Sequence, residues 1–311
     1  MASTHSAQLV RPDGARIAYR LYGTGTHRVP LVLVNGMSSV MPDWAELVPA
    51  LAKTRRVLVF DHRGIGESSL PPDSDDTLSI EMMADDVLAL VEHLGFRTVH
   101  LLGYSMGGLI VQAVLTHEDA RPTKDGRGVS VRGVEVRRAI LTSTFAKSPS
   151  TEFRARNIPR GEGLPKAERD RLVVEYFTKL QYHDDVLVPG HDVQKKFDSR
   201  MVLAAQTRRP QLVILQQSMA ISQCDVREKL KQLPRGLPIM VIHGRRDRMV
   251  RYVESEELLE HIPQAVRYVP RPASSPDGTE EFGHFWFDYF DVERDWVAPI
   301  TRFLDAGEAH L

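Results

Sequence analysis

The sequence predicts a doubly wound α/β fold, with a mostly parallel, eight-stranded sheet, helices on both faces and an inserted helical cap. Three observations support this prediction. Short apolar segments recur along the 311 residues, helical patterns lie between them, and one long charged stretch interrupts the alternation. Alternating strands and helices are typical of parallel sheets covered on both sides.

The strand predictions come from apolar runs of four to six residues, which suit strands buried on both faces. The segment 15–23 (ARIAYRLYG) instead alternates apolar and polar residues and predicts an edge-type strand. The remaining predicted strands cover 30–34, 56–60, 98–102, 138–142, 237–242 and 265–270.

Helical periodicity fills the intervals between these strands. The segment 80–95 has apolar residues at helical spacing and stops at Gly95, a good C-terminal signal. Other predicted helices cover 43–53, 106–117, 253–262 and 292–306. We expect an exposed loop or hairpin at 123–135 and a surface loop at 270–281.

From about Ala146 to Leu233 the chain is charged and helical, with no convincing strand. This predicts a core domain made of residues 1–145 and 234–311 and a helical cap at 146–233. The aromatic and methionine residues of the cap are consistent with either its own core or a pocket lining, and its own core is the simpler interpretation. They are Phe153, Tyr176, Phe177, Phe197 and Met201.

Composition excludes several classes of protein. The net charge of −1 does not favour binding of nucleic acid or anionic membranes, and no apolar run approaches the roughly 20 residues of a membrane helix. The N-terminus lacks a signal-peptide pattern, and Cys224 is the only cysteine, so we expect an intracellular, cytoplasmic protein. The tail Ala309-His310-Leu311 resembles a degenerate peroxisomal import signal, although a chance ending explains it as well.

Ser105 is the candidate nucleophile. It lies in Gly103-Tyr104-Ser105-Met106-Gly107, followed by Gly108, between a predicted strand and a predicted helix. A nucleophile on a sharp strand-to-helix turn has strained dihedral angles and needs small neighbours. The alternative is a glycine-rich turn without chemistry.

A serine nucleophile needs a base and an orienting carboxylate, which follow it in the order acid, then histidine, in this architecture. Asp247 comes directly after the predicted strand 237–242, and His284 lies in an aromatic segment before the last helix. The alternatives are a helix-capping aspartate and a packed loop histidine. The correct order at the ends of strands favours a Ser105, Asp247 and His284 triad.

Acyl transfer also requires hydrogen-bond donors for an oxyanion. The first predicted donor is the backbone N–H of Met106, at the N-terminus of a helix. The second is the amide of Met37, in the loop Asn35-Gly36-Met37 after the strand 30–34, where glycine permits close approach. A plain turn is the alternative for this loop.

Together these motifs resemble those of the α/β-hydrolase superfamily, over nearly the whole chain. They are VNGM (34–37), DHRGIGES (61–68), GYSMGG (103–108), HGRRDRMV (243–250) and FGHF (282–285). Many members have histidine where this chain has Asn35. Within the second motif, turn and cap hydrogen bonds are the expected roles of Asp61, Arg63 and Ser68.

The resemblance implies a serine esterase-like hydrolase that acts on a small or medium-sized substrate without a cofactor. Members that open epoxides or displace halide use aspartate as the nucleophile, so Ser105 favours acyl chemistry. Carbon–carbon bond hydrolysis, lactone opening and acyl transfer on the same triad remain open, as does a ligand receptor built on this fold. No metal site is expected, since His183 and His191 lack a ligand set, and a homodimer is consistent with the sequence.

Overall fold

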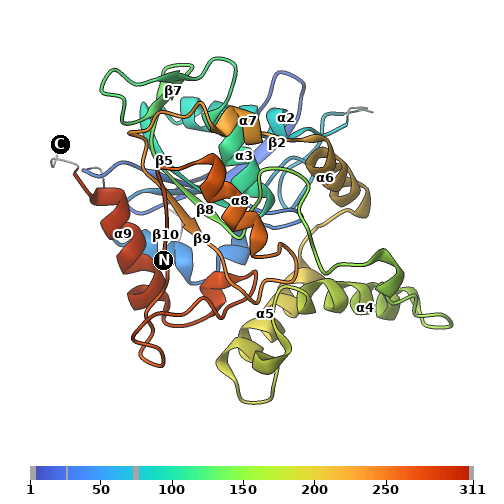
Figure 1. Cartoon of the computed structure of the whole chain (residues 1–311). Helices are drawn as coiled ribbons and strands as arrows, with labels where there is room; N and C mark the ends of the chain where they lie inside the picture. The colour runs from blue at the N-terminus through green and yellow to red at the C-terminus, as the bar shows by residue number, and fades with distance from the viewer. Residues whose placement is uncertain (1–4, 26, 73–76, 308–311) are drawn as a thin grey trace.

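A single mixed sheet forms the centre of the computed structural model, which describes residues 5–25, 27–72 and 77–307 (Figure 1). Six strands run parallel in the spatial order β4-β3-β5-β8-β9-β10, and this confirms the predicted fold class. The strands are β1 His5–Val10, β2 Arg16–Tyr22, β3 Leu31–Val34, β4 Val57–Phe60, β5 Thr98–Tyr104, β6 Arg121–Pro122, β7 Val129–Val131, β8 Val134–Thr142, β9 Ile239–Ile242 and β10 Ala265–Arg267.

The sheet differs from the prediction at its margins. Strand β2 is not an edge strand, because β1 pairs antiparallel with its outer side. The described strands number ten rather than eight, and three of them, β1, β6 and β7, were not predicted as strands; β6 and β7 pair as a hairpin, and β7 also pairs with the first half of β8. The turn and β7 lie within residues 123–135, for which the sequence predicts an exposed loop or hairpin, whereas β6 lies just before that segment and Val129 and Val131 of β7 are buried.

Helices cover both faces of the sheet, as the alternating side chains of each strand require. On β3, Val32 and Val34 pack with helices α2 and α3, whereas Leu31 and Leu33 pack with α1 and α9 on the other face. These helices are α1 Leu47–Leu51, α2 Ile80–His93, α3 Met106–Leu115, α8 Val253–His261 and α9 Ala298–Asp305.

Two predicted helices differ in form from the prediction. The segment 43–53 is split into a 3-10 turn at Met41–Trp44 and the short α1, because Ala45 between them has a positive φ of 42°. The last helix begins as a π-helical turn over Val292–Val297 before it continues as α9.

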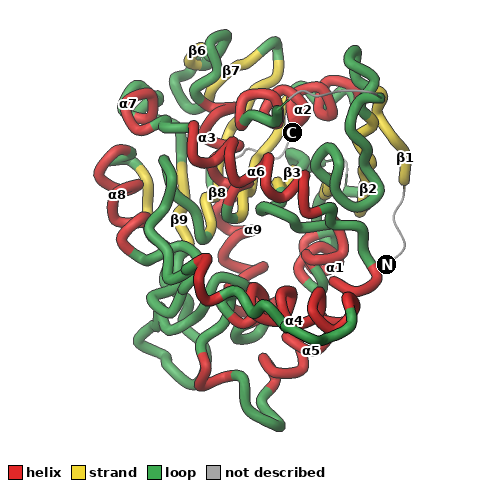
Figure 2. Tube along the Cα trace, turned by 90° about the vertical axis from the view of Figure 1, so that its right-hand side faces the viewer, coloured by secondary structure: helices red, strands yellow, loops and turns green. Residues whose placement is uncertain are grey.

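Between β8 and β9 the chain consists of helices and loops, as the sequence predicts. Figures 1 and 2 agree that α4 and α5 project beyond one end of the sheet, beside α1. The helices are α4 Lys166–Lys179, α5 Asp192–Gln206, α6 Gln211–Gln223 and α7 Arg227–Leu230. Residues 146–233 are called the insertion below, and their status as a separate domain stays a prediction.

Among the described residues, no helix is both long enough and apolar enough to span a bilayer. The C-terminal Ala309-His310-Leu311, considered above as an import signal, lies outside the described residues.

Candidate active site

Ser105 occupies a strained turn between β5 and α3. Its φ of 54° and ψ of −124° lie outside the regions that side-chain-bearing residues ordinarily adopt. The turn is held by the core: the Ser105 amide donates to the Thr142 carbonyl (2.9 Å), and the Thr144 hydroxyl donates to the Ser105 carbonyl (2.6 Å). This is the geometry that exposes a serine hydroxyl above a sheet.

The three flanking glycines have a steric role in this turn. A Cβ on Gly103 would lie 2.4 Å from the Gly107 carbonyl oxygen, and one on Gly107 would lie 2.0 Å from that of Val34. A Cβ on Gly108 would lie 2.4 Å from the Thr144 hydroxyl oxygen. A side chain at any of these positions would therefore displace the turn itself, β3 or the segment that follows β8.

Asp247 and His284 are directly hydrogen-bonded. The His284 Nδ1 lies 2.7 Å from the Asp247 Oδ2, and both side chains are buried. The other oxygen, Oδ1, accepts from the amides of Met249 (2.9 Å) and Val250 (2.8 Å), so the carboxylate has one fixed orientation. Since a carboxylate only accepts, Nδ1 carries the hydrogen and Nε2 is left as the basic nitrogen.

The charge on Asp247 is stabilised by its neighbours. Burial by itself would raise the pKa of this carboxyl, but the imidazoles of His284 and His243 outweigh it and lower the pKa to about 2. His243 lies 3.4 Å from the Asp247 Oδ2 through its Nε2, which also lies 2.9 Å from the Val250 carbonyl oxygen. Asp247 is therefore ionised at neutral pH.

The backbone of His284 is held from two directions. Its amide donates to the carbonyl of Gln181 in the insertion (2.9 Å), and its carbonyl accepts from the Ser143 hydroxyl (3.1 Å). Its ring lies 5.0 Å, centroid to centroid, from that of Tyr104. His284 and Ser105 face the same cavity.

The loop after β3 lies against the Ser105 turn. A Cβ on Gly36 would be only 3.1 Å from the Ser105 Cβ, so glycine permits this close approach. The amides of Met37 and Met106 have no hydrogen-bond acceptor among the described residues, and Met37 lines the cavity. Asn35 lies elsewhere: its Nδ2 donates to the Phe60 carbonyl at the end of β4 (2.8 Å), which ties the loop to the sheet.

The cavity above Ser105 measures about 590 Å³ and lies between the sheet and the insertion. Its apolar walls are supplied mainly by Met37, Val173, Val174, Phe177, Ile214 and Met249. Charged residues at its margin have partners: Arg209 lies 3.1 Å from Asp43, and Lys166 lies 2.5 Å from Asp170. The described lining therefore has no unpaired charge of either sign.

Sequence reasoning did not identify the polar residues that the insertion brings to this site, among them Gln181, Thr207 and Arg209. No motif marks them, because they lie in ordinary charged helical sequence. Of the five aromatic and methionine residues considered for the insertion, only Phe177 lines the cavity. Phe153 and Tyr176 pack against Phe177 instead.

Asp61 and Ser68 make turn hydrogen bonds as predicted, whereas the structural role of Arg63 is an ion pair rather than a turn or cap hydrogen bond. Asp61 accepts from the amides of Met41 (2.7 Å) and Glu67 (2.8 Å), and Arg63 forms a paired contact with Asp86 (2.6 and 2.7 Å). Ser68 donates to the Asp61 carbonyl (2.7 Å). Among the described residues, no cluster of three or more His, Cys, Asp or Glu side chains is suited to hold a metal ion.

Comparisons with known proteins agree with this architecture. The profile of the alpha/beta hydrolase fold matches residues 29–274. A proline iminopeptidase from Lactobacillus crispatus is 35% identical over 99 residues, which are 31% of this chain and 34% of that protein. The match thus spans about a third of that relative's length.

Two solved structures resemble nearly the whole chain. A hydrolase from Pseudomonas aeruginosa superposes with a TM-score of 0.72 at 22% identity, over 98% of this chain and all of that one. The enol-lactonase from Burkholderia xenovorans gives a TM-score of 0.69 at 21% identity, over 96% of this chain and 99% of that one. By its profile match and its architecture, the chain belongs to the alpha/beta-hydrolase family.

Proposed function

We propose that this protein is a serine hydrolase that cleaves carboxylic-ester-type acyl bonds through an acyl-enzyme intermediate. The observation that carries the proposal is the 2.7 Å contact between Asp247 and His284, with His284 and the strained Ser105 on one cavity. A hydrolytic activity also agrees with the names of its relatives, which include a proline iminopeptidase.

In the first half of the proposed reaction, the Ser105 Oγ attacks the carbonyl carbon while the His284 Nε2 takes the hydroxyl proton. Asp247 holds the imidazole in the tautomer that leaves Nε2 free, and its negative charge stabilises the imidazolium. The tetrahedral intermediate collapses when the bond to the leaving group breaks, and His284 protonates the departing oxygen. The acyl group is then esterified to Ser105.

In the second half, a water molecule gives a proton to His284 and attacks the acyl carbonyl carbon. When this tetrahedral intermediate collapses, the bond to the Ser105 Oγ breaks, His284 returns the proton to that oxygen, and the acid is released. Both tetrahedral intermediates carry a negative oxygen. We assign its stabilisation to the amides of Met37 and Met106, which have no protein acceptor among the described residues. One such donor is worth roughly 3–4 kcal/mol in the transition state.

The cavity suggests an uncharged substrate with a short or medium-length apolar acyl group. Its walls are mostly aliphatic and aromatic, and Arg209 and Lys166 are already paired with Asp43 and Asp170. A substrate carboxylate beside Arg209 would have to compete with the buried Asp43 for the guanidinium group. The 590 Å³ of space is in the range of small-molecule sites.

A fluorophosphonate probe tests the nucleophile. We expect it to label the wild-type protein and not Ser105→Ala, as read by mass spectrometry of the modified peptide. An unlabelled wild type, under conditions in which a known esterase reacts, would contradict the proposal.

A panel of p-nitrophenyl esters of graded acyl length tests the reaction. Hydrolysis with a preference for short or medium chains is expected, and a carboxylate at the end of the acyl chain should lower kcat/KM. Labelling of Ser105 without ester hydrolysis would instead indicate carbon–carbon bond hydrolysis, acyl transfer or a receptor with vestigial chemistry.

A further inference from the structure

The loop that carries the Met37 amide is a tight turn in a strained conformation. The Ser39 amide donates to the Gly36 carbonyl (3.3 Å), and Ser38 has a positive φ of 60°. A positive φ at the third residue alone is the signature of a type II turn, a position that ordinarily takes glycine or asparagine. A serine there costs on the order of 1 kcal/mol, so the turn needs outside support.

That support comes from the insertion, through both polar groups of the Ser38 backbone. The Oε1 of Gln217, on α6, accepts from the Ser38 amide (2.9 Å), and the Nη1 of Arg209 donates to the Ser38 carbonyl (3.2 Å). Gln217 is completely buried, and its side chain is hydrogen-bonded through Oε1. A residue 179 positions away in the sequence therefore fixes the orientation of this peptide.

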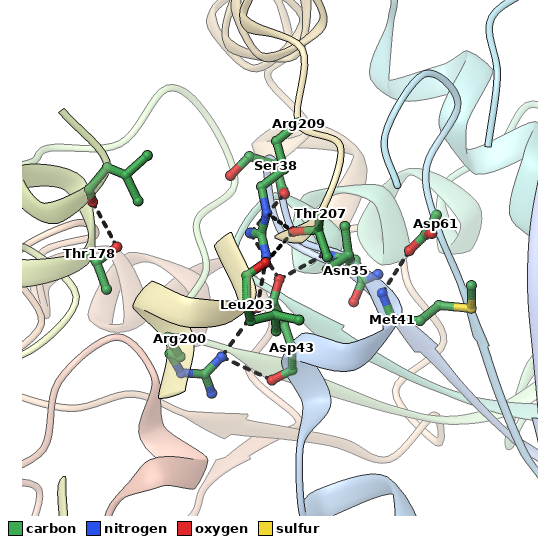
Figure 3. A network of polar contacts seen from close by, with 12 residues as sticks. Asn35, Ser38, Met41, Asp43, Asp61, Thr178, Arg200, Leu203, Thr207 and Arg209 are labelled. Atoms are coloured by element: carbon green, nitrogen blue, oxygen red, sulfur yellow. Dashed lines mark hydrogen bonds and ion pairs between the residues drawn. The ribbon is translucent and has the colours of Figure 1, made fainter. Parts of the chain in front are cut away.

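Arg209 is itself fixed, as Figure 3 shows. Its Nε donates to the Thr207 hydroxyl (2.9 Å) and its Nη2 to the Asp43 Oδ1 (3.2 Å). Arg200 of α5 also contacts Asp43, donating to its carbonyl (3.0 Å), and forms a paired contact with the buried Asp288 (2.6 and 2.9 Å). The insertion thus contacts the segment after β3 at several adjoining points.

We propose that Gln217 is a positioning residue for the oxyanion site, an inference that rests on the proposed acyl chemistry. Type I and type II turns differ chiefly by a flip of the central peptide, here the peptide between Met37 and Ser38. An acceptor facing the Ser38 N–H selects one of the two orientations. The preceding peptide joins Gly36 to Met37, and in a trans peptide the Met37 N–H points away from the Gly36 carbonyl. That carbonyl points into the turn, because it accepts from the Ser39 amide. The N–H therefore points out of the turn, and Gln217 fixes the peptide that follows it, so that the Met37 residue is held in one conformation beside Ser105.

The test compares Gln217→Met, which keeps the length of the side chain but loses the strong acceptor, with Gln223→Met on the exposed end of the same helix. Kinetics are measured with a p-nitrophenyl ester that the wild type hydrolyses. We expect kcat to fall roughly ten- to a hundred-fold for Gln217→Met, less than for complete loss of an oxyanion donor. KM should change by no more than about two-fold, because the acyl pocket is unaltered, and Gln223→Met should match the wild type.

Inhibition by a trifluoromethyl ketone provides a second measurement, because its adduct with Ser105 carries an oxyanion. If Gln217 had only a structural role, its replacement would not change this inhibition. The inhibition constant of the ketone should rise by about the same factor as kcat falls. Gln217→Asn, which withdraws the acceptor by one methylene, serves if Gln217→Met does not fold, and the same losses are expected.

The outcomes separate the two proposals. A wild type that neither hydrolyses esters nor reacts with the fluorophosphonate overturns the acyl chemistry itself. An active wild type whose folded Gln217 variants keep full kcat and inhibitor affinity overturns the positioning role alone.

Discussion

The two halves of the candidate site are stabilised differently. The turn around Ser105 is held by its own glycines and by residues of the neighbouring strand β8, such as Thr142. The turn around Ser38 is held by Gln217 and Arg209, which lie in the insertion. Both turns contain a serine with positive φ.

The comparison shows that the sheet positions the nucleophile, whereas the insertion contacts the loop that carries the Met37 amide. The Ser105 turn forms when β3, β5 and β8 pair, because its contacts are with those strands. The Ser38 backbone is hydrogen-bonded to Gln217 of α6 and to Arg209, so its contacts require the insertion to be in place. A change in how the insertion packs is therefore expected to alter oxyanion stabilisation before it alters the nucleophile.

The largest effect is expected from Ser105→Gly, with Ser38→Gly as the matched variant in the other turn. We expect Ser105→Gly to lower kcat by about 10⁴- to 10⁶-fold, since the proposed nucleophile is lost. Both variants should have a raised Tm, because glycine adopts positive φ without the roughly 1–3 kcal/mol of strain that a side chain incurs.

Calorimetry and ester kinetics check these two variants together. Ser38→Gly should keep most of the activity, since only backbone groups of Ser38 are in use. Full activity in Ser105→Gly would contradict the proposed mechanism, and an unchanged Tm in both would contradict the assignment of strain.

Asp247→Asn is expected to lower kcat by about 10⁴-fold with little change in KM. The amides of Met249 and Val250 keep the Asn oxygen at the Oδ1 position, so the Asn NH₂ faces His284. Nδ1 then accepts, the hydrogen moves to Nε2, and the base is lost. Asp277→Asn, in the exposed loop, is the control, and equal activities of the two variants would count against the proposed role.

Gly107→Ala and Gly36→Ala place the same methyl group in the two turns. In Gly107→Ala the Cβ would meet the Val34 backbone oxygen at 2.0 Å, whereas in Gly36→Ala it would meet side chains of Ser105 and Tyr104 at 3.1 Å. The first should therefore lower the free energy of unfolding by more than about 3 kcal/mol and the second by roughly 1–3 kcal/mol. Urea unfolding measures both, and the reverse order would refute the view that the backbone fixes the Ser105 turn.

The smallest effect concerns Asp61, which accepts from the Met41 amide just beyond the Ser38 turn. Burial raises the pKa of this carboxyl to about 6, from the ordinary value of 3.8. Between about pH 4 and 6 the folded protein therefore binds more protons here than the unfolded chain. The stabilisation of the folded protein that this raised pKa provides is complete below about pH 4 and is lost above about pH 6.

This pH dependence is measured by urea unfolding of the wild type and Asp61→Asn at pH 4 and pH 7. From pH 4 to pH 7 the wild type should lose on the order of 2–3 kcal/mol relative to the variant. Comparing the two proteins cancels the opposite effect of carboxylates such as Asp247, whose pKa is lowered. Parallel pH profiles would contradict the raised pKa of Asp61.

The sequence alone determined the fold class and the residues of the proposed triad, because the signals for both are local. Apolar runs of strand length predict buried parallel strands, and glycines around Ser105 reflect a steric condition of that turn. Asp247 and His284 follow predicted strands, and the carboxyl ends of parallel strands meet at one edge of the sheet. Their 2.7 Å contact agrees with that expectation.

Only the tertiary structure decided how the insertion completes the site. Gln217 stands beside Gln216 in the segment LQQSM, and nothing in the sequence distinguishes the buried one from its neighbour. Nothing in the sequence indicates that β1 pairs with the outer side of β2, or that residues of α4 and α6 line the cavity. These features depend on how distant segments pack, and packing depends on the shape and partners of each surface, which a local pattern does not contain.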